Sequence, residues 1–467
     1  MARLLIVSNR IILPRERSAR AGGLAVALRE ALQRHGGLWL GWSGDIAETT
    51  GVAPRIVHAG KVTYATIDLS RADHQAYYLG YANSTLWPLF HYRLGLLEFR
   101  RAHLEGYLRV NAAFAKALAS QLRPDDVIWA HDYHFMTLAA ELRRLGVKNR
   151  IGFFLHIPFP TTEVFTALTS HELIARSLCA YDLVGFQTEN DVRAFLNYLS
   201  AEAGATVSAN GSFEAFGLRS RAAHFPIGID TEAFEAIARR GAASPETRRL
   251  AGSLAGRALV VGVDRLDYSK GLPQKIDAFY DLLERWPEHR SHVTFMQVAP
   301  VSRGEVAQYR TLRSAIEAAA GRLNGRFAEF DWVPFRYLNK SFSRPTLAGF
   351  YRVARVGLVT PLRDGMNLVA KEYVAAQDPV DPGVLMLSRF AGASHELKAA
   401  LTVNPFDVDQ IADALHQALA MPLDERRARH AAMLEVLRAN TIATWWEAFL
   451  GALQGLPVPT TRTTPIQ

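Results

Sequence analysis

Short apolar runs recur along the whole chain, and longer stretches of helical pattern separate them. The runs are Leu4–Ser8, Val127–Ala130, Ile151–Leu155, Leu183–Phe186, Leu259–Val263, Val293–Val298, Val356–Thr360 and Val384–Leu387. A run this short and this continuously apolar is typical of a strand that is buried on both faces of a parallel sheet. Strands that alternate with helices indicate βαβ units. We therefore predict an α/β protein with parallel sheets and helices on both faces.

The chain has 467 residues, more than one hydrophobic core usually serves. The segment Pro226–Asp230 is a candidate hinge, and a second group of strands starts at Leu259. We expect two Rossmann-like, doubly wound domains facing a cleft, at residues 1–230 and 231–440. The pattern from Asp424 to Leu453 is helical, and we expect its end, 440–455, to pack back on the first domain. We expect residues 456–467, rich in Pro and Thr, to form a disordered tail.

The composition excludes several classes of protein. The net charge is +8 and the pI is 9.6, but Lys and Arg are spread along the chain without a long basic block. This distribution favours anionic small molecules over nucleic acid as partners. No apolar run reaches the ~18 residues that cross a membrane. The single cysteine, Cys179, sits in a predicted helix core and fits a reducing cytoplasm.

The segment Pro361–Glu372 is the most informative motif. It follows a predicted buried strand and leads into a helical pattern, so its backbone N–H groups can bind a phosphate. Asp364 precedes the only glycine of the loop, and Glu372 follows eight residues later. A carboxylate for sugar hydroxyls, amides for phosphate and a carboxylate for ribose suggest a nucleotide-sugar site. The alternative is an ordinary strand-to-helix turn whose acids cap the helix.

Cations follow two other predicted strands. Arg265 and Lys270 lie between a strand and a helix, and Arg303 follows the next strand. Two cations in such a loop can neutralise a diphosphate leaving group without a metal. The alternative is a set of solvated surface charges. Near the N-terminus, Gly22-Gly23 opens a helix and would let a phosphate approach the backbone, although a simple tight turn explains it equally well.

Polar residues also end two strands of the first half. His131, Asp132 and His134 follow one strand, and His156 follows the next. Their spacing lacks the pattern of helical zinc ligands, so binding of sugar hydroxyls by Asp132 is the better interpretation. His156 is either a core histidine or a site residue. The Asp407–Asp409 pair is best explained as a helix N-terminal cap rather than a metal-binding Asp-x-Asp motif.

These motifs together resemble the trehalose-6-phosphate synthases, retaining glycosyltransferases with the two-Rossmann GT-B fold. The resemblance runs from Leu4 to about Trp446, without the loop near Glu48–Lys61, the stretch Ala201–Ala222 and the tail. The segments that carry it, in chain order, are Val7–Arg10, Ala21–Leu24, Leu86–Pro88, Phe90–Arg93, His131–His134, Phe154–Pro160, Gly185–Thr188, Arg265–Gly271 and Pro361–Glu372. So many agreeing segments in the same order are specific to the family.

The resemblance implies transfer of glucose from a nucleotide diphosphate to C1 of glucose-6-phosphate, with retention and without a metal or other cofactor. The implied donor-binding residues are Gly22, Gly23, Arg265, Lys270, Phe342, Asp364, Gly365, Met366, Asn367, Leu368, Val369 and Glu372. The implied acceptor-binding residues are Arg10, Tyr78, Trp87, Asp132 and Arg303. The implied catalytic residues are Asp132, His156, Arg265, Lys270 and Asp364. Arg265 and Lys270 would grip the diphosphate, and the departing phosphate would take the proton of the acceptor.

Several alternatives remain open from the sequence. A sister transferase with another acceptor, such as glycerol phosphate or a cyclitol, shares the scaffold, and a non-catalytic sugar-phosphate sensor would lack the intact donor set. UDP-glucose is the expected donor, but GDP and ADP donors fit the motifs too. Family members are often dimers or tetramers, so we expect a homo-oligomer that binds neither nucleic acid nor membranes.

Overall fold

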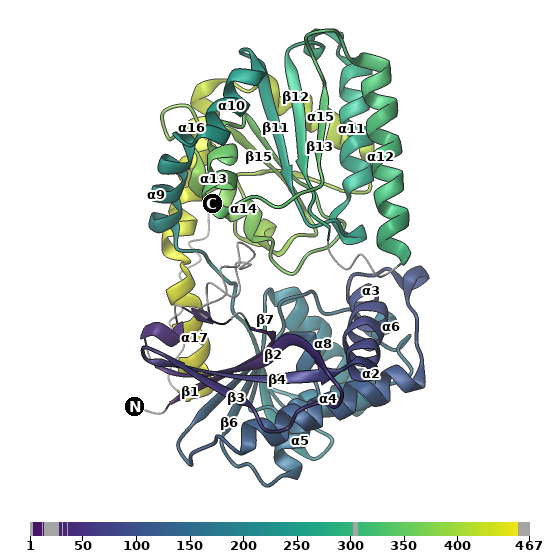
Figure 1. Ribbon diagram of the computed structural model, residues 1–467, viewed down its shortest axis with the longest axis vertical. Helices are drawn as coiled ribbons and strands as arrows, with labels where there is room; N and C mark the ends of the chain where they lie inside the picture. The colour runs from purple at the N-terminus through teal and green to yellow at the C-terminus, as the bar shows by residue number, and fades with distance from the viewer. Residues whose placement is uncertain are drawn as a thin grey trace. The chain divides into compact units, whose positions relative to one another are not determined.

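The computed structural model divides the chain into two units, each with its own sheet. One unit combines the chain up to Ile227 with the segment from Ile442 onward, and the other spans Gly228–Thr441 (Figure 1). The residues that the structure describes are 3–11, 13, 28–29, 31–34, 36–301 and 307–455. The predicted α/β fold with two largely parallel sheets is confirmed. Each unit is described by itself below.

The sheet of the first unit has the order β3-β4-β2-β1-β5-β6-β7-β10-β9-β8. Its strands are β1 (Leu4–Arg10), β2 (Gly37–Ala47), β3 (Arg55–Ala59), β4 (Val62–Ser70), β5 (Val127–His131), β6 (Arg150–Phe154), β7 (Leu183–Phe186), β8 (Thr206–Val207), β9 (Ser212–Ala215) and β10 (Leu218–His224). The strands from β4 to β10 in this order pair in parallel, whereas β3, β9 and β8 add antiparallel edges. Polar residues at the carboxyl ends of β1, β5 and β6 therefore share one edge.

The helical segments of the first unit are α2 (Arg71–Asp73), the π-helical η1 (His74–Leu86), α3 (Trp87–Phe90), η2 (Leu94–Leu96), α4 (Arg101–Ala119), η3 (Tyr133–Phe135), α5 (Leu138–Arg144), α6 (Thr162–Phe165), α7 (His171–Leu178), α8 (Glu189–Ala203) and α17 (Ile442–Leu453). Helix α17 packs on the sheet, where the Phe449 ring stacks on Trp129 with centroids 4.6 Å apart. A Cβ atom on Gly152 or Gly185 would lie 2.7 or 2.6 Å from the Phe449 ring. Glycine at both positions therefore makes room for α17.

The second unit has a six-stranded, fully parallel sheet with the order β13-β12-β11-β14-β15-β16. Its strands are β11 (Ala258–Val263), β12 (Val293–Val298), β13 (Phe335–Leu338), β14 (Val356–Val359), β15 (Val384–Ser388) and β16 (Leu401–Val403). Its helical segments are α9 (Thr231–Ala242), α10 (Pro245–Leu254), η4 (Tyr268–Lys270), α11 (Leu272–Arg285), η5 (Pro287–His289), α12 (Ala307–Phe327), α13 (Arg344–Val353), α14 (Leu368–Ala376), η6 (Gly392–His395), α15 (Val408–Ala420) and α16 (Leu423–Ala439). Helices flank both faces of this sheet (Figure 1).

The helical pattern from Asp424 to Leu453 belongs to two helices, because α16 ends at Ala439 and α17 begins at Ile442. The expected helix at 440–455 corresponds to α17. Asn440 leaves the helical region, with φ −106° and ψ 74°, and its side-chain amide donates to Glu396 at 3.0 Å. Glu396 lies 44 residues earlier in the chain, so a tertiary contact holds the junction between α16 and α17.

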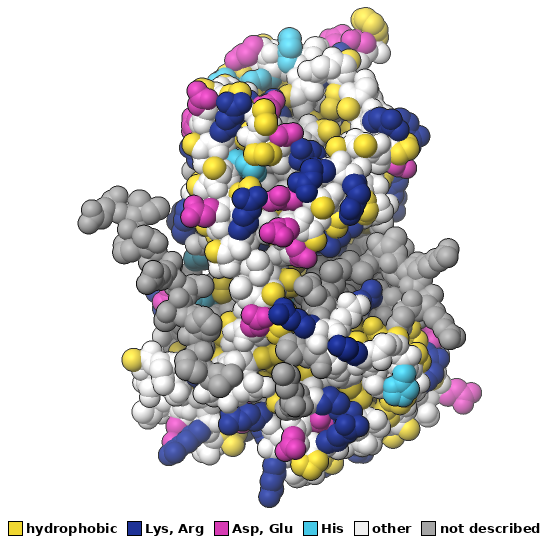
Figure 2. Space-filling view, turned by 90° about the vertical axis from the view of Figure 1, so that its left-hand side faces the viewer, with side chains coloured by type: hydrophobic (Ala, Val, Ile, Leu, Met, Phe, Trp, Pro, Cys, Tyr) yellow, Lys and Arg dark blue, Asp and Glu magenta, His cyan; other side chains and the backbone are white. Residues whose placement is uncertain are grey.

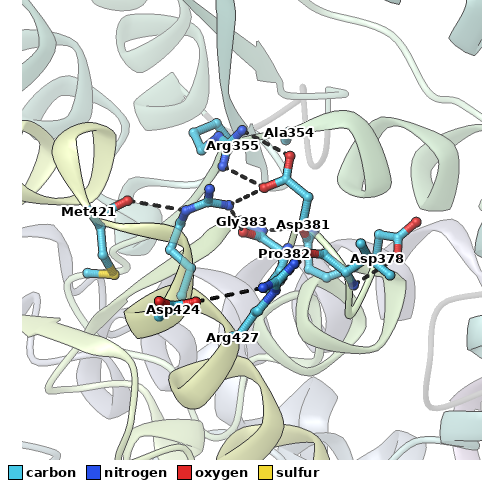
Figure 3. Close-up of polar contacts among 12 residues, drawn as sticks. Ala354, Arg355, Asp378, Asp381, Pro382, Gly383, Met421, Asp424 and Arg427 are labelled. Carbon is cyan, nitrogen blue, oxygen red and sulfur yellow. Dashed lines mark hydrogen bonds and ion pairs between the residues drawn. The ribbon is translucent and has the colours of Figure 1, made fainter.

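The start of α16 is tied to the β14–β15 connection by a charged cluster (Figure 3). Arg355 and Arg426 both donate to Asp381, at 3.1 and 2.6 Å. These hydrogen bonds, that from Arg426 first, hold the pKa of the Asp381 carboxyl below its usual value. The cluster fixes the start of α16 against the connection between β14 and β15.

Cys179 caps the C-terminal end of α7 rather than lying inside it, and it is buried. Burial raises the pKa of the Cys179 thiol to about 12, so the thiolate that would make it reactive is not formed near neutral pH. Among the residues that the structure describes, no helix combines the length and apolar character that a membrane span requires. On the face drawn in Figure 2, Lys and Arg side chains are interspersed with acidic and apolar ones.

Candidate functional site

Two loops of the second unit meet at the carboxyl ends of β11 and β14. Lys270, in the β11 loop, donates through Nζ to Asp364 Oδ2 at 2.6 Å in the β14 loop. Asn367 donates through Nδ2 to the same oxygen at 3.0 Å. The Leu362 N–H donates to the Ser269 carbonyl at 2.8 Å and joins the two backbones. The structure thus brings together the predicted Lys270, Asp364 and Asn367, while Arg265 presents an exposed side chain from the same β11 loop.

A buried carboxylate shapes the β11 loop. Asp267 is fully buried and accepts hydrogen bonds at 2.9 Å from the Ser269 N–H and hydroxyl, and at 3.1 Å from the Tyr309 hydroxyl. Gly271 follows with φ +65°, and a Cβ there would lie 2.5 Å from the Thr360 carbonyl oxygen. Only glycine allows this turn and this close approach. These contacts hold Lys270 beside the β14 loop.

A second buried network holds the residue before Arg265. Lys275 is fully buried and donates to Asp264 Oδ2 at 2.5 Å, and Gln297 donates to the same oxygen at 3.1 Å. Paired charges of this kind are stable in a protein interior only when hydrogen-bonded. The network anchors the end of β11 to α11 and β12. Neither Asp264, Lys275 nor Gln297 was selected from the sequence.

The loop before α14 is closely braced. Asn367 adopts a left-handed conformation (φ 76°, ψ 87°) and caps the helix by accepting from the Ala370 N–H at 3.2 Å. Leu368 and Val369 open the helix, so their N–H groups have no carbonyl partner one turn earlier in α14. Such N–H groups form an anion site.

The neighbouring η6 segment forms hydrogen bonds with the loop before α14. The Ala393 N–H donates to the Met366 carbonyl at 2.8 Å, and the Gly392 N–H donates to the Asp364 carbonyl at 3.2 Å. A Cβ on Gly392 would lie only 1.9 Å from the Gly365 oxygen. The sequence could not predict that η6 approaches Gly365 and Met366 so closely. The partners are about 27 residues apart and follow two different strands, β14 and β15.

Glu372 lies one turn into α14, with Arg344 Nη2 3.5 Å from its carboxylate. Burial raises the pKa of the Glu372 carboxyl to about 7, and the Arg344 guanidinium opposes this rise. The charge of the Glu372 carboxylate therefore changes near neutral pH.

Phe342 precedes α13. Its ring packs edge-on against Phe350, with centroids 5.2 Å apart, and the Lys340 ammonium lies 5.0 Å from its centre.

In the first unit, Arg10 and Tyr78 belong to one aromatic and cationic cluster. The Arg10 guanidinium lies 5.8 Å from the centre of the Trp42 ring, and the Tyr78 ring lies 6.0 Å from it. His74 and His134 stack on Tyr78, at 5.4 and 6.0 Å. Trp42 escaped the sequence analysis because β2 was not predicted, and His74 because η1 was not.

Asp132 has a strained backbone at the end of β5, with φ 74° and ψ 167°. That region is populated almost only by glycine, and other residues are held in it mainly at functional sites. The Asp132 carboxylate accepts a hydrogen bond from the backbone N–H of His156 at 3.3 Å. Trp87 is buried, and its ring centre lies 5.6 Å from that of Tyr133, the residue after Asp132.

His156 is held at both ring nitrogens. Its Nε2 lies 3.1 Å from His131 Nδ1, and its Nδ1 lies 3.4 Å from Gln187 Nε2. The amide nitrogen of Gln187 can only donate, so this contact favours the tautomer of His156 that carries its hydrogen on Nε2. Burial lowers the pKa of His156 to about 3, so the ring is neutral at physiological pH. Burial and the neighbouring His156 lower the pKa of His131 well below its usual value too.

Three predicted site residues, Gly22, Gly23 and Arg303, lie outside the described residues. The structure confirms the interpretation of Asp407 as a helix cap, because its carboxylate accepts from the Gln410 N–H at 2.9 Å at the start of α15. His131 and His134 do not act as a metal pair with Asp132 in the described geometry, since His131 faces His156 and His134 stacks on Tyr78.

Comparison with known proteins places these residues in a family context. Residues 3–455 match the model of Glycosyltransferase family 20. A trehalose-6-phosphate synthase of Cronobacter sakazakii is 50% identical over 454 residues, which cover 97% of this chain and 95% of the relative. A crystal structure of an α,α-trehalose-phosphate synthase (UDP-forming) from Burkholderia vietnamiensis is 49% identical with a TM-score of 0.95, covering 98% of this chain and 99% of that one.

Two similar solved structures contain ligands. A UDP-forming synthase from Burkholderia xenovorans, in complex with glucose-6-phosphate, is 50% identical with a TM-score of 0.93, and the match covers 97% of this chain and all of that one. A protein from E. coli bound with UDP-2-fluoro glucose is 48% identical with a TM-score of 0.93, and the match covers 98% of this chain and all of that one.

Proposed function

The chain belongs to glycosyltransferase family 20, and we propose that it is an α,α-trehalose-6-phosphate synthase that transfers glucose from UDP-glucose to glucose-6-phosphate. The observation that carries this proposal is the 2.6 Å contact between Lys270 and Asp364. It sets a cation for phosphate beside a carboxylate for sugar hydroxyls, at the carboxyl ends of two parallel strands. Ligand sites of doubly wound folds lie at this edge.

The donor is held by the second unit. Lys270 and the exposed Arg265 bind the diphosphate, and the Leu368 and Val369 amides add fixed donors to it. Asp364, with the amides of Gly365, Met366 and Asn367, holds the glucose ring. Glu372 accepts the ribose hydroxyls, and Phe342 lines the base pocket. Gly22 and Gly23, which lie outside the described residues, complete the proposed set of donor-binding residues.

The proposed acceptor residues of the first unit are Arg10, Tyr78, Trp87 and Asp132, and Arg303, outside the described residues, is the fifth. Arg10 and Tyr78, clustered around Trp42, bind the phosphate of the acceptor with Arg303. Trp87 packs against the sugar, and Asp132 accepts its hydroxyls. The strained backbone of Asp132 supports this role, because a structure retains such strain where the side chain must point in one direction.

The transfer proceeds on the front face of the donor and retains its configuration. As the bond from C1 to the diphosphate oxygen breaks, the departing phosphate takes the proton of the attacking acceptor hydroxyl and the new bond forms on the same face. Arg265 and Lys270 stabilise the developing negative charge without a metal. Burial lowers the pKa of His156 to about 3, so its ring is neutral; it positions the glucose and does not act as an acid.

The proposal is tested by nucleotide release from the purified protein. UDP-, GDP- and ADP-glucose are each offered with glucose-6-phosphate, glycerol-3-phosphate or water. We expect fast release from UDP-glucose only with glucose-6-phosphate. Release with glycerol-3-phosphate instead would assign a sister transferase, and binding of both ligands without release would indicate a sensor. Light scattering during size-exclusion chromatography would test the homo-oligomer that we also propose.

A further inference from the structure

A second group of ligating side chains lies away from the donor loops in the second unit. His289 ends the short η5 turn just before β12, and His416 lies near the C-terminal end of α15. Glu288 is the third member. The η5 turn precedes β12, whereas the donor loops follow the carboxyl ends of β11 and β14. The group therefore lies at the opposite edge of the parallel sheet from the donor loops.

The three side chains already stand close together. His289 Nε2 lies 2.9 Å from His416 Nδ1. One ligand atom from each of Glu288, His289 and His416 lies within 4.8 Å of the others, and this is the only group of three such residues among those that the structure describes. Zinc binds imidazole nitrogens at about 2.0–2.1 Å, so two nitrogens on one tetrahedral ion stand roughly 3.3 Å apart. The histidine nitrogens need to separate by only a few tenths of an ångström.

Both imidazoles are held in place by their surroundings. The Trp286 ring stacks on His416, with centroids 4.5 Å apart and planes 11° from parallel. The backbone N–H of His289 donates to the Trp286 carbonyl at 3.0 Å, and Pro287 fixes the backbone of the turn. Arg285, which also packs on Trp286, is paired with Asp413 at 2.5 Å. Orientation of ligating rings by such neighbours strengthens metal sites.

The chemistry of the three side chains suits a cation. Glu288 is exposed and supplies the negative charge. Two imidazoles and one carboxylate are a ligand set that suits zinc and similar divalent ions, with water in the fourth position.

We propose that Glu288, His289 and His416 form a zinc-binding site that links the η5 turn to α15. The ion takes the place of the hydrogen that His289 Nε2 and His416 Nδ1 share. That hydrogen moves to the other nitrogen of the same ring through solvent, so the neutral pair needs to release no proton. The site is separate from glucosyl transfer, and its presence does not depend on the proposed function.

The test is to treat the full chain with a chelator, remove the chelator, and titrate the protein with zinc in a calorimeter at pH 7.5. We expect one equivalent bound with a Kd below about 10 μM, and at least about tenfold weaker binding in His289→Ala and in His416→Ala. His292→Ala is the matched control, because His292 is exposed three residues further along and outside the group; it should bind zinc as the parent does.

A spectroscopic measurement guards against a variant that merely folds poorly. Co²⁺ in place of zinc should give the visible absorption of a tetrahedral site in the parent and in His292→Ala, and lose it in His416→Gln. Zinc should raise the Tm of the parent but not that of His416→Gln. Parent protein that binds no zinc at 100-fold excess over about 1 μM protein, or histidine variants that bind it as tightly as the parent, would overturn the proposal.

Discussion

The backbone of Asp132, at φ 74° and ψ 167°, costs of order 1–3 kcal/mol for any residue other than glycine. Asp132→Gly and Asp132→Ala both remove the carboxylate, but only glycine releases the strain. We expect both variants to lose most activity, with Asp132→Gly more stable than Asp132→Ala by about 1–2 kcal/mol. Denaturant unfolding of the two variants measures the difference. An alanine variant as stable as the glycine variant would show that the backbone is not strained there.

Lys270 is the residue on which the proposed leaving-group stabilisation depends most. Lys270→Ala removes the cation beside Asp364, and we expect kcat to fall about 100-fold or more, a far larger effect than the loss of stability. Lys398→Ala is the matched control, because Lys398 is an exposed lysine of the same unit outside both donor loops. Steady-state kinetics and thermal unfolding of both variants separate catalysis from folding. Unchanged kcat in Lys270→Ala would remove the proposed role.

Glu372 should make donor binding depend on pH. Its pKa is raised to about 7 by burial, so the carboxylate that accepts ribose hydroxyls becomes protonated as the pH falls below 7. We expect KM for UDP-glucose to rise as the pH falls from 8 to 6, by up to about tenfold per pH unit once Glu372 is protonated. The KM of Glu372→Gln should be higher at pH 8 and nearly independent of pH. A parent KM that stays constant over this range would contradict the assignment.

At the scale of elements, the buried Lys275–Asp264 pair holds the end of β11 against α11. Removing one partner of a buried pair leaves an uncompensated charge, which typically costs about 3–5 kcal/mol. We therefore expect Lys275→Met to destabilise the second unit by roughly 3 kcal/mol and to raise KM for the donor through displacement of Arg265. The double variant Lys275→Met/Asp264→Asn should recover part of the stability, since no charge then remains buried. Urea unfolding followed by donor kinetics would show either effect, and a fully stable Lys275→Met would refute the argument.

Fully buried parallel strands were the most predictable elements. Leu183–Phe186 and Val293–Val298 match β7 and β12 at both ends. The first has no polar side chain, and only Thr294 and Gln297 interrupt the apolar residues of the second. β2 was missed, since Gly37–Ala47 mixes glycine, tryptophan and polar residues and looks like neither pattern. The expected helix at 440–455 begins two residues before α17, since no proline or glycine marks the break after Ala439.

The candidate site shows the same division. Asp364, Glu372 and Lys270 could be selected because each follows a strand and stands beside a glycine or a helix start. Their supports could not, because Tyr309, Gln297 and the η6 segment reach the loops from other strands and helices. Contacts between distant segments depend on sheet order, which alternating strands and helices leave undetermined.

At the scale of the whole molecule, the chain forms one unit, crosses to a second and returns at Ile442 to complete the first. The proposed donor residues belong mainly to the second unit, and most of the proposed acceptor residues belong to the first. The family match over residues 3–455 spans both units, so we expect the proposed reaction to need both.

The most direct test is to determine the linkage of the product by NMR, using UDP-glucose labelled with ¹³C at C1 and unlabelled glucose-6-phosphate. Our account predicts one disaccharide phosphate in which both anomeric centres are α and the labelled carbon is bonded through oxygen to C1 of the acceptor. A β configuration at the labelled carbon would contradict retention. Labelled free glucose, or linkage to another acceptor hydroxyl, would contradict the proposed function itself.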